Sequence, residues 1–273
     1  MDFRLLVRNR KALVGSIGLL SVCFLAIAAP VLTHYGPFQL HTAQAFTPPC
    51  IAHLMGVDDL GRDVFTQFMY GARTSLLSGL TAALTAAAIG IVVGTVAGYY
   101  GGILDNLLMR ITEIVMIIPS FFLALVLISV LGPSILNIIF VIGILQWTNM
   151  ARLVRSEMVS IKELGFVEAL RMLGVSKFRI LFLEILPNML GLVFVTTSYG
   201  VAQAMLLEVY LSFLGLGDPS VASWGHMMMS NKVFLMQAWW TLFFPGIGIL
   251  ITILSVNLLG DGLNEITKRR GVH

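Results

Sequence analysis

The sequence predicts an all-α integral membrane protein with about six transmembrane helices. Hydrophobic residues make up 58% of the 273 residues and charged residues 11%, whereas soluble domains carry roughly 25% charged residues. The apolar runs are continuous rather than alternating, which favours helices over a closed barrel, the other structure that satisfies its backbone in lipid. Six runs approach the ~20 residues that a spanning helix needs. They cover residues 12–32, 74–100, 107–131, 134–151, 187–213 and 241–260.

The distribution of basic residues predicts that both chain ends are cytoplasmic. Loops rich in Lys and Arg stay on the cytoplasmic side of a membrane. With the N-terminus inside, all of the 17 Lys and Arg residues except Arg62, Arg73 and Lys232 fall on that side. The positive charge is therefore a topology signal, and no basic stripe interleaved with aromatic residues indicates nucleic acid. The first run is longer than the apolar part of a signal peptide, so we expect it to remain as a span.

The longest segment outside the membrane is expected at residues 33–73. A turn within "GVDDLGRD" precedes a short helix that leads into the second run, with Asp63 as its N-cap. His34, His41 and His53 lie in this segment at spacings that match no metal site. We therefore expect these histidines to be exposed loop residues.

The second run carries a small residue at every fourth position. These residues are Ala82, Ala86, Gly90, Gly94 and Gly98. In lipid, such ridges allow two helix backbones to approach closely. We expect this helix to pack against another helix along its length, and we favour a helix of the same chain over one of a partner chain.

Two acidic residues lie within the apolar runs, Glu113 in the third and Glu208 in the fifth. A carboxylate inside the membrane is costly and is often functional, which makes both residues candidates for a pore or gate. Both are near the ends of their runs, however, and Arg110 is one turn from Glu113, so structural pairing is the favoured role. Pro119 is expected to kink the third span.

Charged residues are frequent at residues 163–188, between the fourth and fifth runs. This segment is here called the elbow. Phe166, Leu170 and Leu173 recur at positions i, i+4 and i+7, which predicts a short helix with an apolar stripe. Gly174 stands where a helix ends in the left-handed conformation that glycine adopts easily. The elbow is therefore predicted to begin with a helix and a tight turn.

The second half of the elbow predicts another short helix. Ser176 is positioned to cap it, and Pro187 suits the first turn of the fifth span. Helices of this length are marginal by themselves in water. The mixture of acidic and basic residues disfavours a lipid surface as the support. We expect a groove on another protein to hold the elbow.

The sequence contains no motif for catalysis, nucleotide binding or metal binding. It has no Gly-Lys pair and therefore no G-x-x-x-x-G-K-[ST] phosphate loop. It also has no H-E-x-x-H, no G-x-S-x-G and no Cys/His cluster with ligand spacing. We expect no catalytic residue, no metal ligand and no bound cofactor in this chain.

The elbow and four other segments resemble the dipeptide/oligopeptide/nickel family of ABC-importer permeases, and in particular its second, C-type subunit. The segments read "GVDDLGRDVFTQFMYGARTSL", "YYGGILDNLLMRITEIVMIIPS", "LSFLGLGDPSVASWG" and "FPGIGILITILSVNLLGDGLNE". The elbow matches the family's E-A-A…G…L-P loop through Glu168, Ala169, Gly174, Leu186 and Pro187. It departs from the loop at Leu170, where the family has a second alanine, and at Glu184, where isoleucine is common. The resemblance runs from about residue 4 to 267.

The resemblance implies a type I ABC importer (MetI-like) permease fold in the bacterial cytoplasmic (inner) membrane. It implies three kinds of partner: a homologous permease subunit that forms a heterodimer with this chain, two ATP-binding subunits that hold ATP and magnesium, and an extracytoplasmic substrate-binding protein. It also implies that the elbow is the coupling helix, which docks in a groove on an ATPase subunit. The residues expected to make this contact are Phe166, Glu168, Ala169, Leu170, Arg171, Leu173 and Gly174. Segments 56–73 and 215–240 are expected to meet the binding protein.

The expected organisation has three parts. Residues 1–73 form a cytoplasmic tail, the first span and the outer loop; residues 74–265 form the permease core with the coupling loop 152–186; residues 266–273 form a cytoplasmic tail. Di- and oligopeptides are the expected cargo, and nickel or a metal chelate is the alternative. The methionines of segment 224–237 suit a soft metal, but apolar filling is their favoured role. A remote alternative is a secondary transporter driven by an ion gradient, which would show paired broken helices.

Overall fold

The computed structural model describes residues 9–270, with side chains as far as Ile266. In this part of the chain five helices are long and apolar enough to span a membrane. They are α2 (Arg10–Leu32), α3 (Val64–Tyr100), α6 (Ile135–Ile161), the helix Lys177–Leu216 that contains α9 (Leu186–Leu211), and α11 (Trp240–Arg270). α4 (Gly102–Ile117) and α5 (Ser120–Leu131) are bent by 83° at their junction and make a sixth span when the pair is taken as one. The prediction of about six transmembrane helices is confirmed.

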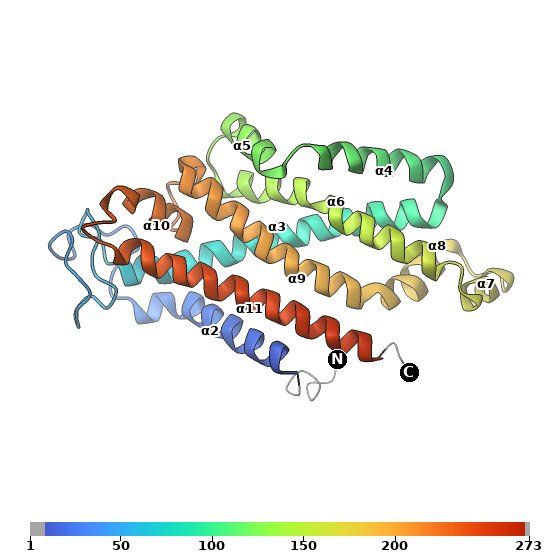
Figure 1. The fold of residues 1–273 in the computed structure, drawn as a ribbon, viewed down its shortest axis with the longest axis horizontal. Helices are drawn as coiled ribbons and strands as arrows, with labels where there is room; N and C mark the ends of the chain where they lie inside the picture. The colour runs from blue at the N-terminus through green and yellow to red at the C-terminus, as the bar shows by residue number, and fades with distance from the viewer. Residues whose placement is uncertain (1–8, 271–273) are drawn as a thin grey trace.

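The long helices run side by side along the long axis of the molecule (Figure 1). The outer loop and α10 (Trp224–Asn231) lie at one end, whereas α7 (Gly165–Met172), the start of α2 and the end of α11 lie at the other. The ends of the described chain are joined there, because Lys11 Nζ contacts Glu265 Oε1 at 2.6 Å. The predicted placement of both termini on one side is therefore confirmed. Arg4 and Arg8, on which the predicted orientation also rests, and residues 271–273 lie outside the described residues.

The small-residue ridge of α3 packs against α6 of the same chain. A Cβ atom added to Gly94 would lie 2.4 Å from Ala151 O, and one added to Gly98 would lie 2.8 Å from Arg155 O. Only glycine, which has no Cβ, allows the backbones of α3 and α6 to approach this closely. The prediction of an intramolecular helix contact is confirmed. α6 also continues beyond the predicted end of its span at residue 151, to Ile161.

Asp63 caps α3 as predicted, and its carboxylate accepts a 2.8 Å hydrogen bond from Thr66 N. The predicted short helix and the second span are, however, one continuous helix, because no proline or cap interrupts the sequence between Val64 and Tyr100. The same carboxylate contacts His53 Nδ1 at 2.8 Å, and His53 is buried. The expectation that His53 is an exposed loop residue is wrong.

Pro119 breaks the third span, and the predicted kink is confirmed. The residue before a proline is forced into extended backbone, and Ile118 has φ −83° and ψ 124°. The first half of the span is fixed to α6 by an ion pair, in which Arg155 Nε and Nη2 donate to the two oxygens of Asp105 at 3.0 and 2.6 Å. The N-terminal end of α4 is thus joined to α6.

Asp58 organises the outer loop that precedes α3. It is fully buried, and its carboxylate accepts hydrogen bonds from Arg62 Nε at 2.6 Å and Gln67 Nε2 at 2.8 Å. Trp240 at the start of α11 donates to Val57 O at 3.1 Å. This network joins the loop to α3 and α11 at the outer end of the bundle.

Asp59 in the same loop destabilises the folded state, and the size of this destabilisation depends on pH. Burial, and then the neighbouring Asp58 carboxylate, raise the pKa of Asp59, while Arg62 opposes them. One carboxylate oxygen is buried without a hydrogen bond, since Arg62 Nη2 is 3.8 Å away. When a carboxyl pKa is raised by folding, protonation favours the folded state, and this contribution is lost as the pH rises through the folded pKa. At neutral pH the charged Asp59 therefore destabilises the fold.

We expect Asp59→Asn to raise the apparent Tm of the purified protein in detergent at pH 7. The gain should shrink as the pH falls through the raised folded-state pKa of Asp59, and it should be lost below about 4, the usual aspartate pKa. Asp58→Asn serves as the contrast, because it removes a hydrogen-bonded carboxylate and should lower the Tm at pH 7. An unchanged Tm for Asp59→Asn at pH 7 would contradict the expectation.

Candidate functional site

The elbow begins with the helix α7. This helix ends in a tight, hydrogen-bonded turn. Val175 N donates to Leu170 O at 3.1 Å, and Gly174 N donates to Arg171 O at 3.1 Å. This pair of bonds is a Schellman motif, which requires a left-handed residue after the helix. Gly174 has φ +70°. The predicted glycine turn is confirmed.

The inner face of α7 packs on the core of its own chain. Val167 is fully buried in a cluster with Met158, Ile161 and Ile180, and Leu170 and Val175 pack on the same cluster. The expectation that another protein must hold the elbow is therefore incomplete, because α6 and the start of the fifth span already support it.

The outer face of α7 is apolar and uncovered in the single chain. Phe166 is 42% exposed, Met172 83% and Leu173 78%. Phe178, on α8 (Lys177–Arg179) after the turn, is 69% exposed. The three residues of the predicted apolar stripe therefore do not share one face. Phe166 and Leu173 face outward, whereas Leu170 packs α7 against the core of its own chain. Met172 and Phe178 belong to the outward surface, although the sequence pattern did not assign them to it.

Polar residues surround this apolar surface. Glu168 is exposed beside it, as is the small apolar residue Ala169. The guanidinium of Arg171 lies 5.6 Å from the ring centroid of Tyr99 at the end of α3, a cation–π geometry. Glu168 and Arg171 both line a groove of about 710 Å³ between α7 and Tyr99. Arg171 therefore links the elbow to α3.

The second half of the elbow differs from the prediction. No separate short helix ends before Pro187; Ser176 caps a helix that runs without a break from Lys177 through the fifth span. A π-helical segment, Ile180–Ile185, precedes the proline. Proline lacks an N–H and clashes with the carbonyl one turn earlier, and the wider π turn accommodates it. The elbow is thus continuous with α9.

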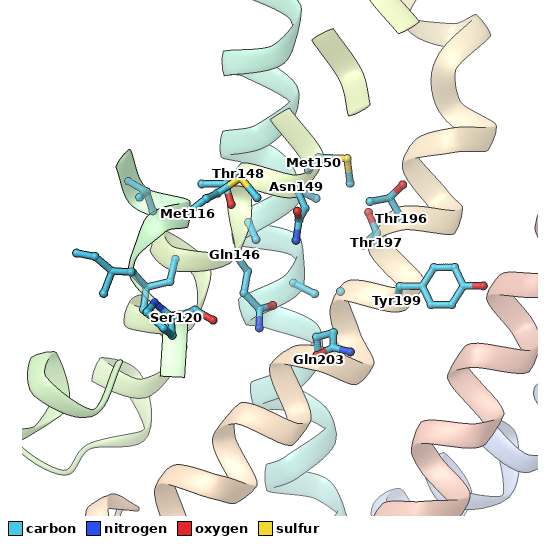
Figure 2. Close-up of a pocket in the computed structure, with 18 residues that line it drawn as sticks. Met116, Ser120, Gln146, Thr148, Asn149, Met150, Thr196, Thr197, Tyr199 and Gln203 are labelled. Atoms are coloured by element: carbon cyan, nitrogen blue, oxygen red, sulfur yellow. The ribbon is translucent and has the colours of Figure 1, made fainter. Parts of the chain in front are cut away.

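A second candidate site is a cavity of about 440 Å³ between α3, the α4/α5 break, α6 and α9. Figure 2 shows Gln146 and Asn149 reaching from α6 into the space that faces Thr197 and Gln203 of α9. Tyr199 points away from this space, and its hydroxyl donates to Asp261 of α11. The cavity places amide and hydroxyl groups in the interior of a membrane protein.

An adjoining cavity of about 460 Å³ shares Ser120, Gln146 and Gln203 with the first. Its other lining residues are apolar or aromatic and include Phe121, Tyr210, Phe213 and Leu214. The lining of the first cavity is more polar than that of the second, and Ser120, Gln146 and Gln203 border both.

Sequence analysis missed these polar residues because it considered only charged groups within the spans. A usable signal was present: Gln146 and Asn149 are three residues apart, and Thr196 and Gln203 seven apart, so each pair shares a helix face. Neither Glu113 nor Glu208, the predicted pore or gate candidates, lines either cavity. Glu113 is exposed and contacts Arg110 Nη1 at 3.2 Å.

Glu208 is fully buried between α3 and the end of α9. Its carboxylate accepts hydrogen bonds from Ser212 Oγ at 2.8 Å and Ser75 Oγ at 3.4 Å. These contacts favour the structural role over the gate role, which stays a prediction. Removing the carboxylate would leave both hydroxyls without this partner, which costs about 1–3 kcal/mol for each buried group.

We expect Glu208→Gln to transport like the unchanged protein, because the amide oxygen still accepts a hydrogen bond. Glu208→Leu should instead lower the amount of folded protein recovered from membranes. Both variants would be compared by uptake per folded transporter in proteoliposomes. Loss of uptake in a well-folded Glu208→Gln variant would assign the residue to the gate.

Among the residues that the structure describes, no group of three or more His, Cys, Asp or Glu side chains is arranged to hold a metal ion. Within the methionine-rich segment, Met227 is buried in an apolar cluster beside Trp224, and Met228 packs on it. These two methionines fill apolar space, which is the role that the sequence favoured.

Comparison with known proteins agrees with this architecture. A family model described as binding-protein-dependent transport system inner membrane component matches residues 90–271, and one for the N-terminal TM domain of oligopeptide transport permease C matches residues 3–49. The chain is 42% identical over 265 residues to the dipeptide transport system permease protein DppC of Escherichia coli K12, covering 94% of this chain and 88% of the relative. It is 38% identical over 258 residues to the oligopeptide transport system permease protein OppC of Bacillus subtilis 168, covering 94% and 85%.

A putative peptide transport system permease protein of Brucella abortus is 38% identical over 268 residues, covering 98% of this chain and 90% of the relative. These relatives are named as permease proteins of bacterial transport systems, and this chain is a multi-pass membrane permease subunit, as expected. The chain belongs to the family of binding-protein-dependent transport system inner membrane components.

Proposed function

We propose that this permease subunit imports di- and oligopeptides delivered by an extracytoplasmic binding protein. The observation that carries the cargo assignment is the 42% identity to a dipeptide permease over 94% of the chain. Nickel and metal chelates, the alternative cargo, are favoured neither by these relatives nor by a metal site among the described residues. A secondary transporter is not supported, because the matched family depends on binding proteins.

The elbow is the proposed coupling element to an ATPase subunit. Phe166 and Leu173 supply an apolar anchor for the ATPase groove, and Met172 extends it. Interfaces place such anchors centrally and surround them with polar residues, a role that suits Glu168 and Arg171, while the exposed Ala169 is small enough to allow close approach of the groove. Because α7 is seated on its own core and continuous with α9 through the turn, a push on the elbow moves the fifth span.

Three residues position this anchor. Gly174 sets the direction of the turn, Leu170 seats α7 on the core, and Arg171 fixes α7 to Tyr99 of α3. These roles rest on the φ of +70° at Gly174, the burial of the Leu170 side chain against the core cluster, and the 5.6 Å cation–π distance.

The proposed assembly contains a homologous permease subunit, two ATP-binding subunits and the binding protein. ATP and magnesium are held by the ATP-binding subunits. At the outer end, Ile51, Val233 and Met236 are highly exposed apolar residues. Much of segment 56–73 is buried by contrast, so within the two predicted contact segments the part around Val233 and Met236 is the better surface for the binding protein.

The test is reconstitution of the complete transporter in proteoliposomes. Uptake of labelled di- and tripeptides should require ATP and the binding protein, and it should persist when proton and sodium gradients are collapsed. The permease purified alone should show no ATPase activity. Uptake that follows an ion gradient, or uptake of nickel complexes but not of peptides, would overturn the proposal.

A further inference from the structure

The two adjoining cavities are lined by uncharged side chains. Neither of the two adjoining cavities has an Asp, Glu, Lys or Arg among its lining residues. The acidic residues of the spans are held elsewhere: Glu208 between two serines and Asp105 in its ion pair with Arg155. The first cavity is polar without being charged.

Several polar groups in this cavity have no partner within the described chain. Gln146 makes no hydrogen bond, and its Oε1 is buried. Leaving a buried acceptor unpaired costs about as much as a lost hydrogen bond, so native proteins rarely keep one without a reason. Gln203 also makes no hydrogen bond within the described chain.

The cavity threonines Thr196 and Thr197 differ from three hydroxyl residues elsewhere in the spans. Thr85, Ser129 and Ser198 each donate to the carbonyl four residues earlier in their own helix, at 2.9, 2.8 and 2.9 Å. Thr196 and Thr197 make no such bond, so their hydroxyls are free to bind a ligand in the cavity that they line.

We propose that Gln146, with Gln203, Thr196 and Thr197, binds the main chain of the peptide in transit; this rests on the proposed peptide-import function. Every peptide group carries one donor and one acceptor, and a side-chain amide offers both. A volume of about 440 Å³ lies within the ~300–1,000 Å³ typical of small-ligand sites. Recognition of the main chain by neutral groups accepts peptides of either charge.

The uncharged lining has a consequence for specificity. A fixed charge would reject peptides of the same sign, since like charges in a site of low dielectric constant repel each other strongly. A neutral lining does not impose this selection. The structural alternative is that these amides pair with helices of the partner permease, as polar residues do between membrane helices. A charge introduced into such a helix contact would not act on the cargo.

The test introduces charge at Gln146 and at Gln203, which is exposed in the single chain. The complete transporter would carry Gln146→Glu, Gln146→Arg, Gln203→Glu or Gln203→Arg, and arginine stays charged in any site. Uptake of Ala-Lys-Ala and Ala-Glu-Ala would be measured in proteoliposomes. We expect the Lys-to-Glu uptake ratio to rise in the Glu variants and fall in the Arg variants by about tenfold or more, which corresponds to about 1.4 kcal/mol.

Comparing each ratio with that of the unchanged transporter cancels any preference of the binding protein. Gln44→Glu, at an exposed outer-loop glutamine, is the matched control and should leave the ratio unchanged. A ratio that stays constant in all four cavity variants overturns the inference, whether overall uptake is retained or lost equally for both peptides. If the unchanged transporter imports neither peptide, the proposed function fails, and the inference fails with it.

Discussion

Replacing Phe166 and Leu173 together by aspartate is expected to abolish ATP-driven uptake while the permease still folds and inserts. Both side chains are exposed in the single chain, at 42% and 78%, so charge at these positions costs the isolated fold little. In the assembled transporter the same side chains are proposed to fill an apolar groove on the ATPase. Truncating a central interface residue costs about 2 kcal/mol or more, which is roughly 30-fold in affinity, and a buried unpaired charge costs more.

The measurement is co-purification of the ATPase subunits with the tagged permease, followed by uptake in proteoliposomes. Ile51→Asp is the matched control, because this apolar side chain is 98% exposed in the outer loop, at the opposite end of the bundle. It should retain the ATPases. Val167→Asp provides a second contrast: its side chain is fully buried, so that variant should fail to fold. An intact complex with the Phe166/Leu173 double variant would remove the elbow from the coupling interface.

The sequence predicted the elements whose signals are local. The apolar runs, the cap at Asp63, the break at Pro119 and the left-handed turn at Gly174 each depend on a few neighbouring residues, and the structure contains all four. The small-residue ridge also carried its own signal. The ridge did not show which helix packs against it. That helix, α6, is known only from the fold.

The features that were missed depend on contacts between distant segments. α7 carries apolar residues on both faces, so its periodicity did not show that Val167 faces the core while Phe166 and Leu173 face outward. The burial of His53 depends on its pairing with Asp63 in the folded loop. The polar cavity is assembled from four parts of the chain, and each contributes too few residues to be recognised alone.

Gly94→Leu, at the contact between α3 and α6, is expected to prevent the protein from accumulating in the membrane. A Cβ at this position would lie 2.4 Å from Ala151 O and 2.8 Å from Val154 Cβ. Backbone atoms on a packed helix cannot rotate away as a flexible side chain can. The two helices must therefore separate, and their van der Waals contact is lost. This contact is important because hydrophobic attraction does not hold helices together in lipid.

Overpacking that shifts the backbone typically costs about 1–3 kcal/mol and occasionally more, a large part of a typical stability of about 5–15 kcal/mol. Gly246→Leu is the matched control, because Gly246 also lies inside a membrane helix, α11, but a Cβ there has nothing within 4 Å. Leucine even favours the helix relative to glycine. Membrane levels and the apparent Tm in detergent should fall sharply for Gly94→Leu and stay unchanged for Gly246→Leu. Equal behaviour of the two variants would show that the ridge does not hold α3 against α6.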